Sequence, residues 1–123
     1  MSDFDSGRVV VTADESAAGL EVSDLAGGSV AAVADNVQTT IVTYTASGKV
    51  LISHISTSGT VYAKMQLYKN ATLIETKRGG PDRTQVFEFL RPLRLNNGDI
   101  LDVKVTHYNV GQTAEFEATV YGG

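Results

Sequence analysis

From Gln38 onward, hydrophobic and polar residues alternate along the chain in short runs, and turn-forming residues such as glycine and asparagine separate the runs. Alternation with a period of two is typical of β-strands that bury one face. It predicts seven strands, over residues 38–45, 49–57, 60–69, 72–78, 83–90, 100–108 and 113–121. Evenly spaced strands with turns between them predict an all-β fold, a sandwich or a barrel, and we expect an antiparallel β-sandwich with seven or eight strands.

The alternation also predicts which side chains face the core. In residues 60–69 it turns the following side chains outward: Tyr62, Lys64, Gln66 and Tyr68. In residues 113–121 it turns these side chains inward: Ala114, Phe116, Ala118 and Val120. Asn70 and Ala71 are expected to form a tight hairpin turn. Pro92 has no amide hydrogen for a central strand, so any continuation of the strand at residues 83–90 through it is expected at a sheet edge.

Residues 1–38 differ from the rest of the chain in composition and charge. Seven acidic residues against one base give them a net charge of −6, whereas residues 39–123, with nine bases and seven acids, carry +2. We predict an acidic N-terminal arm with one or two short strands over residues 1–38 and a β-sandwich domain over residues 39–123. Residues 8–12 read as a strand that would pair at a sheet edge or reach a partner. The acidic charge would either dock the arm on a basic neighbour or simply keep the chain soluble.

The bulk properties exclude several classes of protein. A chain of 123 residues is long enough for one domain with a core of its own. It has no apolar run near the roughly 18 residues of a membrane helix, no pattern typical of a signal peptide, and no cysteine for a disulfide framework. The net charge of −4, without a concentrated basic run, argues against a nucleic-acid partner.

The sequence offers no catalytic constellation. His54 and His107 are the only histidines, each lies within a predicted strand, and cysteine is absent, so a shared metal site is less favoured than two satisfied or surface histidines. The turn at residues 96–99, with Asp102 close by, has the oxygen ligands that calcium takes, but turn chemistry alone explains it. We therefore predict no enzymatic activity, no metal and no cofactor.

Two surface features are candidates for binding. Tyr62 and Tyr68 share one strand face, about 20 Å apart at roughly 3.3 Å per residue. Outward tyrosine, lysine and glutamine suit a protein interface, where tyrosine is enriched, and a carbohydrate platform is the alternative. Residues 77–83 gather three bases at a turn, Arg78 and Arg83 among them, which would meet an acidic partner such as the arm of a neighbouring copy.

The final third of the chain resembles jelly-roll modules of the tumour-necrosis-factor and complement globular-head type. In those modules a Leu-x-x-Gly-Asp turn opens a long strand, and an aromatic-bearing strand ends the domain. Leu95, Gly98 and Asp99 match the turn, and residues 116–121 match the last strand. The likeness covers about 30 residues and implies the same sandwich.

The whole chain resembles small jelly-roll accessory proteins of tailed-phage virions, of the head decoration or cement type, in being a small, cysteine-free sandwich with a Gly/Ala/Asp-rich arm. The resemblance implies a virion location, capsid or tail proteins as partners, and a homo-oligomer, in particular a trimer. The alternative is a carbohydrate- or receptor-binding module of a tail or another complex. The residues expected at the protein interface are Arg8, Val9, Val10, Val11, Tyr62, Tyr68, Arg78 and Arg83.

Overall fold

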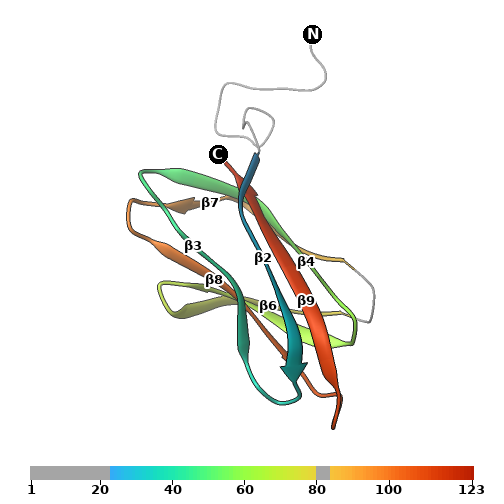
Figure 1. The fold of residues 1–123 in the computed structure, drawn as a ribbon. Coiled ribbons are helices and arrows are strands. Elements are labelled where there is room, and N and C mark those ends of the chain that lie inside the picture. The colour runs from blue at the N-terminus through green and yellow to red at the C-terminus, as the bar shows by residue number, and fades with distance from the viewer. Residues whose placement is uncertain (1–22, 80–83) are drawn as a thin grey trace.

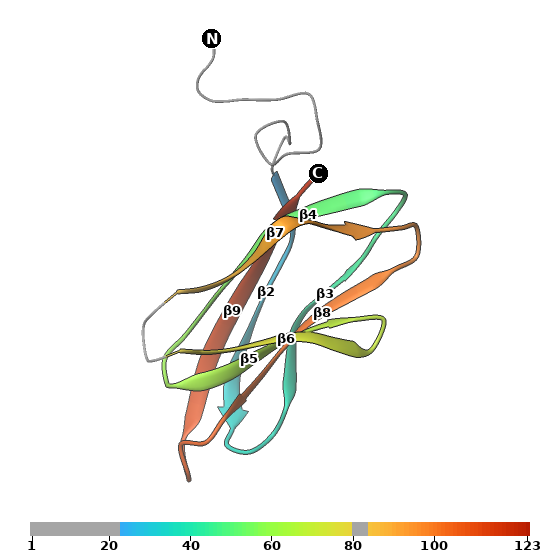
Figure 2. The ribbon, with the colours of Figure 1, turned by 180° about the vertical axis from the view of Figure 1, so that it is seen from behind.

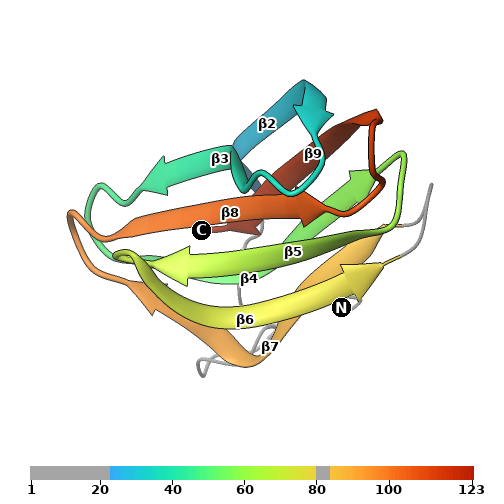
Figure 3. The same ribbon diagram turned by 90° about the horizontal axis from the view of Figure 1, so that it is seen from below.

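The computed structural model describes residues 23–79 and 84–123, which form eight strands and no helix. The strands are β2 (Ser23–Ala34), β3 (Thr39–Thr45), β4 (Val50–Gly59), β5 (Ala63–Lys69), β6 (Thr72–Gly79), β7 (Gln85–Leu95), β8 (Ile100–His107) and β9 (Thr113–Gly122). The first sheet has the order β2-β9-β4-β7 and the second sheet the order β3-β8-β5-β6 (Figures 1 and 3). All strand pairs are antiparallel. The prediction of an antiparallel β-sandwich is confirmed.

The strand order is that of a jelly roll, because successive strands alternate between the two sheets. β5 and β6 alone are consecutive strands that also pair with each other within the described residues. The turn at residues 96–99, by contrast, carries the chain from β7 in the first sheet to β8 in the second. The residues of a turn therefore show where the chain reverses direction. Whether the next strand joins the same sheet or the facing sheet depends on how the strands pack around the core.

The core lies between the sheets and follows from the alternation in each strand. Ala114, Phe116, Ala118 and Val120 of β9 are all buried, as predicted. The inward residues of β5 are buried too: Ala63, Met65 and Leu67. The largest fully buried hydrophobic side chains are Phe87, Phe116, Ile52, Ile55, Leu67, Leu95 and Leu101. Burial of these side chains is the main source of stability in a fold without disulfides.

The predicted boundary between arm and sandwich at residue 38 is wrong. Residues 23–34, assigned to the arm, form the long strand β2, which pairs with β9 along its whole length from Ser23 to Ala34 (Figures 1 and 2). The alternation missed this strand because its residues are mostly small. Small residues are required here, since a Cβ on Gly28 would lie 2.3 Å from the carbonyl oxygen of Ile41. The sandwich therefore begins at or before Ser23, and the rest of the predicted arm, with residues 8–12, lies outside the described residues.

The edge strands β6 and β7 carry features that oppose pairing with other chains. β6 is an edge strand of the second sheet, and its core-side positions Glu75 and Lys77 carry charges that pair at 3.8 Å. Charges that point inward on an edge strand discourage strand addition. β7, which contains Pro92, is an edge strand of the first sheet as predicted, and its pairing with β4 is interrupted between Glu88 and Leu93. Both edges on this side of the sandwich thus carry features that oppose association.

The β5–β6 hairpin turn is confirmed at Asn70 and Ala71, and alanine is strained there. Both residues have positive φ, 51° and 68°, as in a type I′ turn. We expect Ala71→Gly to raise the free energy of unfolding by about 1 kcal/mol, because an L-residue in this region costs roughly 1–2 kcal/mol and added chain entropy of glycine offsets part of the gain. Urea unfolding followed by circular dichroism measures the change. Gly98→Ala, at φ 89°, is the control and should shift stability in the opposite direction.

Candidate functional site

The outer face of the second sheet brings several aromatic and basic side chains near one another. β5 turns Lys64, Gln66 and Tyr68 outward because the residues between them are buried. Tyr62 lies immediately before the strand and is 55% exposed. β8 and β6 run on either side of β5 and add side chains from the same face. We call this surface the tyrosine–lysine face, made of Tyr62, Lys64, Gln66, Tyr68, Arg78, Lys104 and Tyr108.

Contacts within the tyrosine–lysine face hold its centre in place. The Lys104 ammonium lies 4.7 Å from the centre of the Tyr68 ring, a cation–π contact across β5 and β8. The Gln38 side-chain amide donates hydrogen bonds to the Gln66 amide oxygen (2.9 Å) and to the Tyr68 hydroxyl (3.1 Å). One face of the Tyr68 ring is therefore already occupied by a cation, which makes it a poor platform for stacking a sugar.

The charge of the tyrosine–lysine face is positive. Lys64 on β5 is paired directly with Arg78 on β6, and Gln66 is paired with Lys104 on β8. The acid on the same side is Asp102, which accepts a hydrogen bond from the Thr43 hydroxyl. Like charges directly opposite each other in a sheet are destabilising. The Lys64–Arg78 pair thus costs stability.

Two exposed tyrosines lie at the same end of this face. Ala63 and His107 are paired, Tyr62 precedes the first and Tyr108 follows the second, so both tyrosines lie at the same end of β5 and β8. Tyr108 is 50% exposed, and the Lys64 ammonium lies 5.8 Å from its ring centre. The aromatic pair that the structure brings together is therefore Tyr62 and Tyr108, rather than Tyr62 and Tyr68 at opposite ends of β5.

The outer face of the first sheet is acidic. The carboxylates on it are Asp24 of β2, Glu88 of β7, and Glu115 and Glu117 of β9, and all four residues are exposed. We call this surface the acidic face. Its base is Arg94, near the end of β7, and Arg91 lies in the interrupted part of that strand.

One row of side chains crosses all four strands of the acidic face. The paired positions are Asp24, Tyr121, His54 and Glu88. The rings of His54 and Tyr121 are stacked, with centres 4.5 Å apart and planes at 15°. Ser53 lies beside this row, with its hydroxyl 3.0 Å from Nδ1 of His54. The row combines hydrogen-bonding groups with an aromatic surface.

A shallow hollow of about 420 Å³ opens at the end of β4. Its lining residues are Ser29, Val30, Ala31, Ser58, Gly59, Thr60, Glu115, Phe116 and Glu117. An irregularity in β2 between Val30 and Val33 lies beside it, and Gly59 in its lining has no room for a side chain, since a Cβ there would lie 2.2 Å from the Phe116 ring. The titratable lining groups of the hollow are the carboxylates of Glu115 and Glu117.

The two histidines lie in unrelated surroundings. His107 is fully buried, with Nε2 2.7 Å from the Val33 carbonyl oxygen, and its Nδ1 accepts a hydrogen bond from the Asn109 amide at 3.2 Å. His54 lies on the outer side of the first sheet, against Tyr121. In the described part of the chain, no group of three or more His, Cys, Asp or Glu is placed to hold a metal ion.

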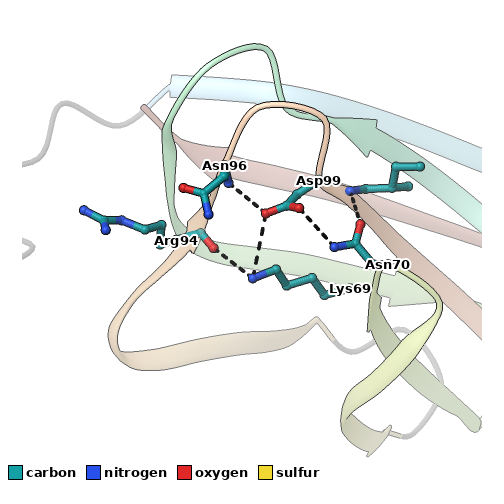
Figure 4. A network of polar contacts seen from close by, with 6 residues as sticks. Lys69, Asn70, Arg94, Asn96 and Asp99 are labelled. Carbon is teal, nitrogen blue, oxygen red and sulfur yellow. Dashed lines mark hydrogen bonds and ion pairs between the residues drawn. The ribbon is translucent and has the colours of Figure 1, made fainter.

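The turn at residues 96–99 is bound by the protein's own donors. The Asp99 carboxylate accepts hydrogen bonds from the Asn96 amide (2.8 Å) and the Asn70 side chain (3.0 Å), and the Lys69 ammonium lies 3.9 Å away (Figure 4). The Asn70 oxygen in turn accepts a hydrogen bond from the Ile100 amide. These contacts tie the β7–β8 turn to the β5–β6 turn. These contacts account for the sequence of residues 96–99 as that of a hydrogen-bonded turn. Asp102 lies outside this cluster and accepts a hydrogen bond from the Thr43 hydroxyl.

The Asp99 contacts make stability depend on pH. The hydrogen bond from Asn70, then that from Asn96, lowers the pKa of Asp99 below its usual value. A carboxylate with a depressed pKa stabilises the fold above its unfolded pKa of about 3.9, and this contribution is lost as the pH falls through the folded pKa. We expect Asp99→Asn to be less stable than the unchanged protein at neutral pH, with the difference shrinking below about pH 4. Urea unfolding over this pH range tests it; a constant difference would contradict it.

The structure brings together three of the residues expected at an interface. Tyr62, Tyr68 and Arg78 all lie on the tyrosine–lysine face. Arg8, Val9, Val10, Val11 and Arg83 lie outside the described residues. Two residues of the face, Lys104 and Tyr108, were not predicted. The outward alternation of residues 100–108 carries the signal for both, but only the pairing of β8 with β5 shows that they join this surface.

The chain matches no protein-family model, and no curated protein is significantly similar to it. Among the described residues, no helix has the length and apolar character needed to cross a membrane. The fold and its two outer faces are therefore the features that bear on function.

Proposed function

We propose that this protein is a non-enzymatic structural protein of a phage particle, a capsid decoration protein that attaches in many copies to the head lattice. The observation that carries the proposal is the sandwich with jelly-roll strand order, whose two outer sheet faces carry many polar and charged side chains. The jelly roll recurs in viral capsid proteins and lectins, although a fold alone does not define a function. The tyrosine–lysine face supports an adhesive role, because it gathers tyrosine and arginine, which are enriched at interfaces.

The mechanism would be attachment through the tyrosine–lysine face together with the N-terminal arm. Each contact needs only modest affinity, because copies bound side by side on a lattice gain from multivalency. Residues 8–12 would add a strand to a neighbouring sheet edge. Capsid or tail proteins would be the partners, and the virion would be the location.

The test is co-sedimentation of the purified protein with heads of the encoding phage from which this protein has been removed. We expect stoichiometric binding, and loss of binding in a chain without residues 1–22, which retains all eight described strands. Arg78→Glu should weaken binding, whereas Lys49→Glu in the β3–β4 turn is the matched control and should not. Normal occupancy by the shortened chain would contradict the role of the arm, and absence of the protein from particles would contradict the proposal.

A second candidate is a carbohydrate-binding module. The observation that favours it is the pair of half-exposed tyrosines, Tyr62 and Tyr108, at one end of the second sheet beside Lys64. Binding on a glycan array that is lost in Tyr62→Ala and in Tyr108→Ala, but kept in Tyr68→Ala, would support this candidate. No glycan binding, or binding that is indifferent to both tyrosines, would eliminate it.

A further inference from the structure

The two outer faces of the sandwich carry opposite charge. The acidic face carries four carboxylates, from Asp24, Glu88, Glu115 and Glu117, against Arg94 near the end of β7 and Arg91 beside it. The tyrosine–lysine face carries the bases Lys64, Arg78 and Lys104 against Asp102. The two faces lie on opposite sides of the molecule, because they are the outer sides of two packed sheets (Figure 3).

We infer that the acidic face of one copy docks on the tyrosine–lysine face of a second copy. The acidic side presents exposed carboxylates on β2, β9 and β7, and the basic side presents ammonium and guanidinium groups on β5, β6 and β8. Surfaces of opposite charge attract over distances near the Debye length and disfavour the reversed pairings, in which like charges meet. The occupant of each face is thus the opposite face of the same chain.

This contact is heterologous, since two different surfaces meet. A heterologous contact between opposite sides of a sandwich repeats from copy to copy in one direction, so it gives an open stack instead of a closed ring. The mean mass in solution should therefore rise steadily with concentration. The trimer expected from the resemblance to virion jelly rolls would instead level off at three copies. The inference concerns the isolated protein, so its failure and that of the decoration proposal are distinguishable.

The experiment is sedimentation velocity of the full chain at protein concentrations up to about 1 mM, the range in which weak contacts become visible. We expect a concentration-dependent rise in mass at about 0.01 M salt that disappears near 1 M, where the Debye length falls to about 3 Å. A strict monomer at low salt, a plateau at three copies, or association that persists unchanged at high salt would each overturn the inference.

Charge reversal identifies the surfaces. Glu115→Lys/Glu117→Lys makes both faces basic, and Lys64→Glu/Lys104→Glu makes both acidic, so each variant alone should associate at least roughly tenfold more weakly. Mixed one to one, the two variants should associate again, because the basic face of the first and the acidic face of the second are unchanged. Lys49→Glu, in the β3–β4 turn outside both faces, also makes the net charge more negative and should keep its self-association. A mixture that stays monomeric would overturn the proposed pairing.

The acidic N-terminal segment is the competing occupant of the basic face. Neutralising its carboxylates by Asp3→Asn, Asp5→Asn, Asp14→Asn, Glu15→Gln and Glu21→Gln leaves both sheet faces unchanged. We expect this variant to associate as the unchanged chain does. Loss of association in this variant would assign the basic face to the N-terminal segment and overturn the pairing of the two sheet faces.

Discussion

His107→Ala is expected to lower the free energy of unfolding by about 4 kcal/mol, the largest effect of any substitution proposed for this chain. His107 is a buried polar side chain that links the two sheets: it lies on β8 of the second sheet, and its Nε2 bonds the carbonyl oxygen of Val33 on β2 of the first at 2.7 Å. Its Nδ1 accepts a hydrogen bond from the Asn109 amide. Alanine would leave both backbone groups without this partner and open a cavity beside Phe116, whose ring centre lies 6.0 Å away.

Both ring nitrogens of His107 have defined roles. Because Nδ1 accepts from a backbone amide, the proton of the neutral ring belongs on Nε2, where it is donated to Val33. His107→Gln keeps a donor for the carbonyl but lacks the ring, so it should fall between alanine and the unchanged protein. His54→Ala, at a partly exposed position, is the control and should cost less than about 1 kcal/mol. Urea unfolding measures all three, and an alanine variant within about 1 kcal/mol of the unchanged protein would refute the linking role.

The strands that the sequence predicts well are those with large apolar residues at alternate positions. β5 and β9 are examples, because their large apolar side chains, Met65, Leu67 and Phe116, are buried in the core. β2 escaped prediction for the opposite reason: its small residues show no alternation, although the close approach of β3 leaves no room for a side chain at Gly28. Hydrophobic alternation therefore reveals positions where large side chains are buried. It does not reveal positions where close packing leaves no room for a large side chain.

The candidate site was predictable only in part, because it is assembled across strands. Tyr62 and Tyr68 follow from alternation within one segment. Lys104 joins them through the register of β8 against β5, which pairs residues about 40 positions apart, and no local pattern fixes that register. The acidic face depends even more on topology, since Asp24 and Glu88 come from opposite edges of the first sheet and are brought into one row by β9 and β4.

Gly28→Ala is expected to lower the free energy of unfolding by about 3 kcal/mol, although it adds only one methyl group. Gly28 lies on β2, where the edge of the first sheet approaches β3 at the edge of the second. An ideal Cβ at this position would lie 2.3 Å from the carbonyl oxygen of Ile41 and 3.3 Å from Cβ of Val42. The clashing atom belongs to the backbone of β3, which is held in place by its pairing with β8. The clash can therefore be relieved only if β2 and β3 separate. Separation would also disturb Val33, and with it the hydrogen bond to His107.

The adjacent glycine provides the matched control. A Cβ on Gly27 would meet its nearest atoms, the Ala118 carbonyl oxygen and the Thr119 hydroxyl, at 3.8 Å, which is ordinary contact. Gly27→Ala should therefore leave stability unchanged or raise it by up to about 1 kcal/mol, since alanine reduces the entropy of the unfolded chain. Urea unfolding of the two variants separates steric exclusion from a general intolerance of β2. Equal losses in both would mean that the strand depends on glycine for its backbone conformation, and a neutral Gly28→Ala would mean that β2 does not approach β3 as closely as this packing requires.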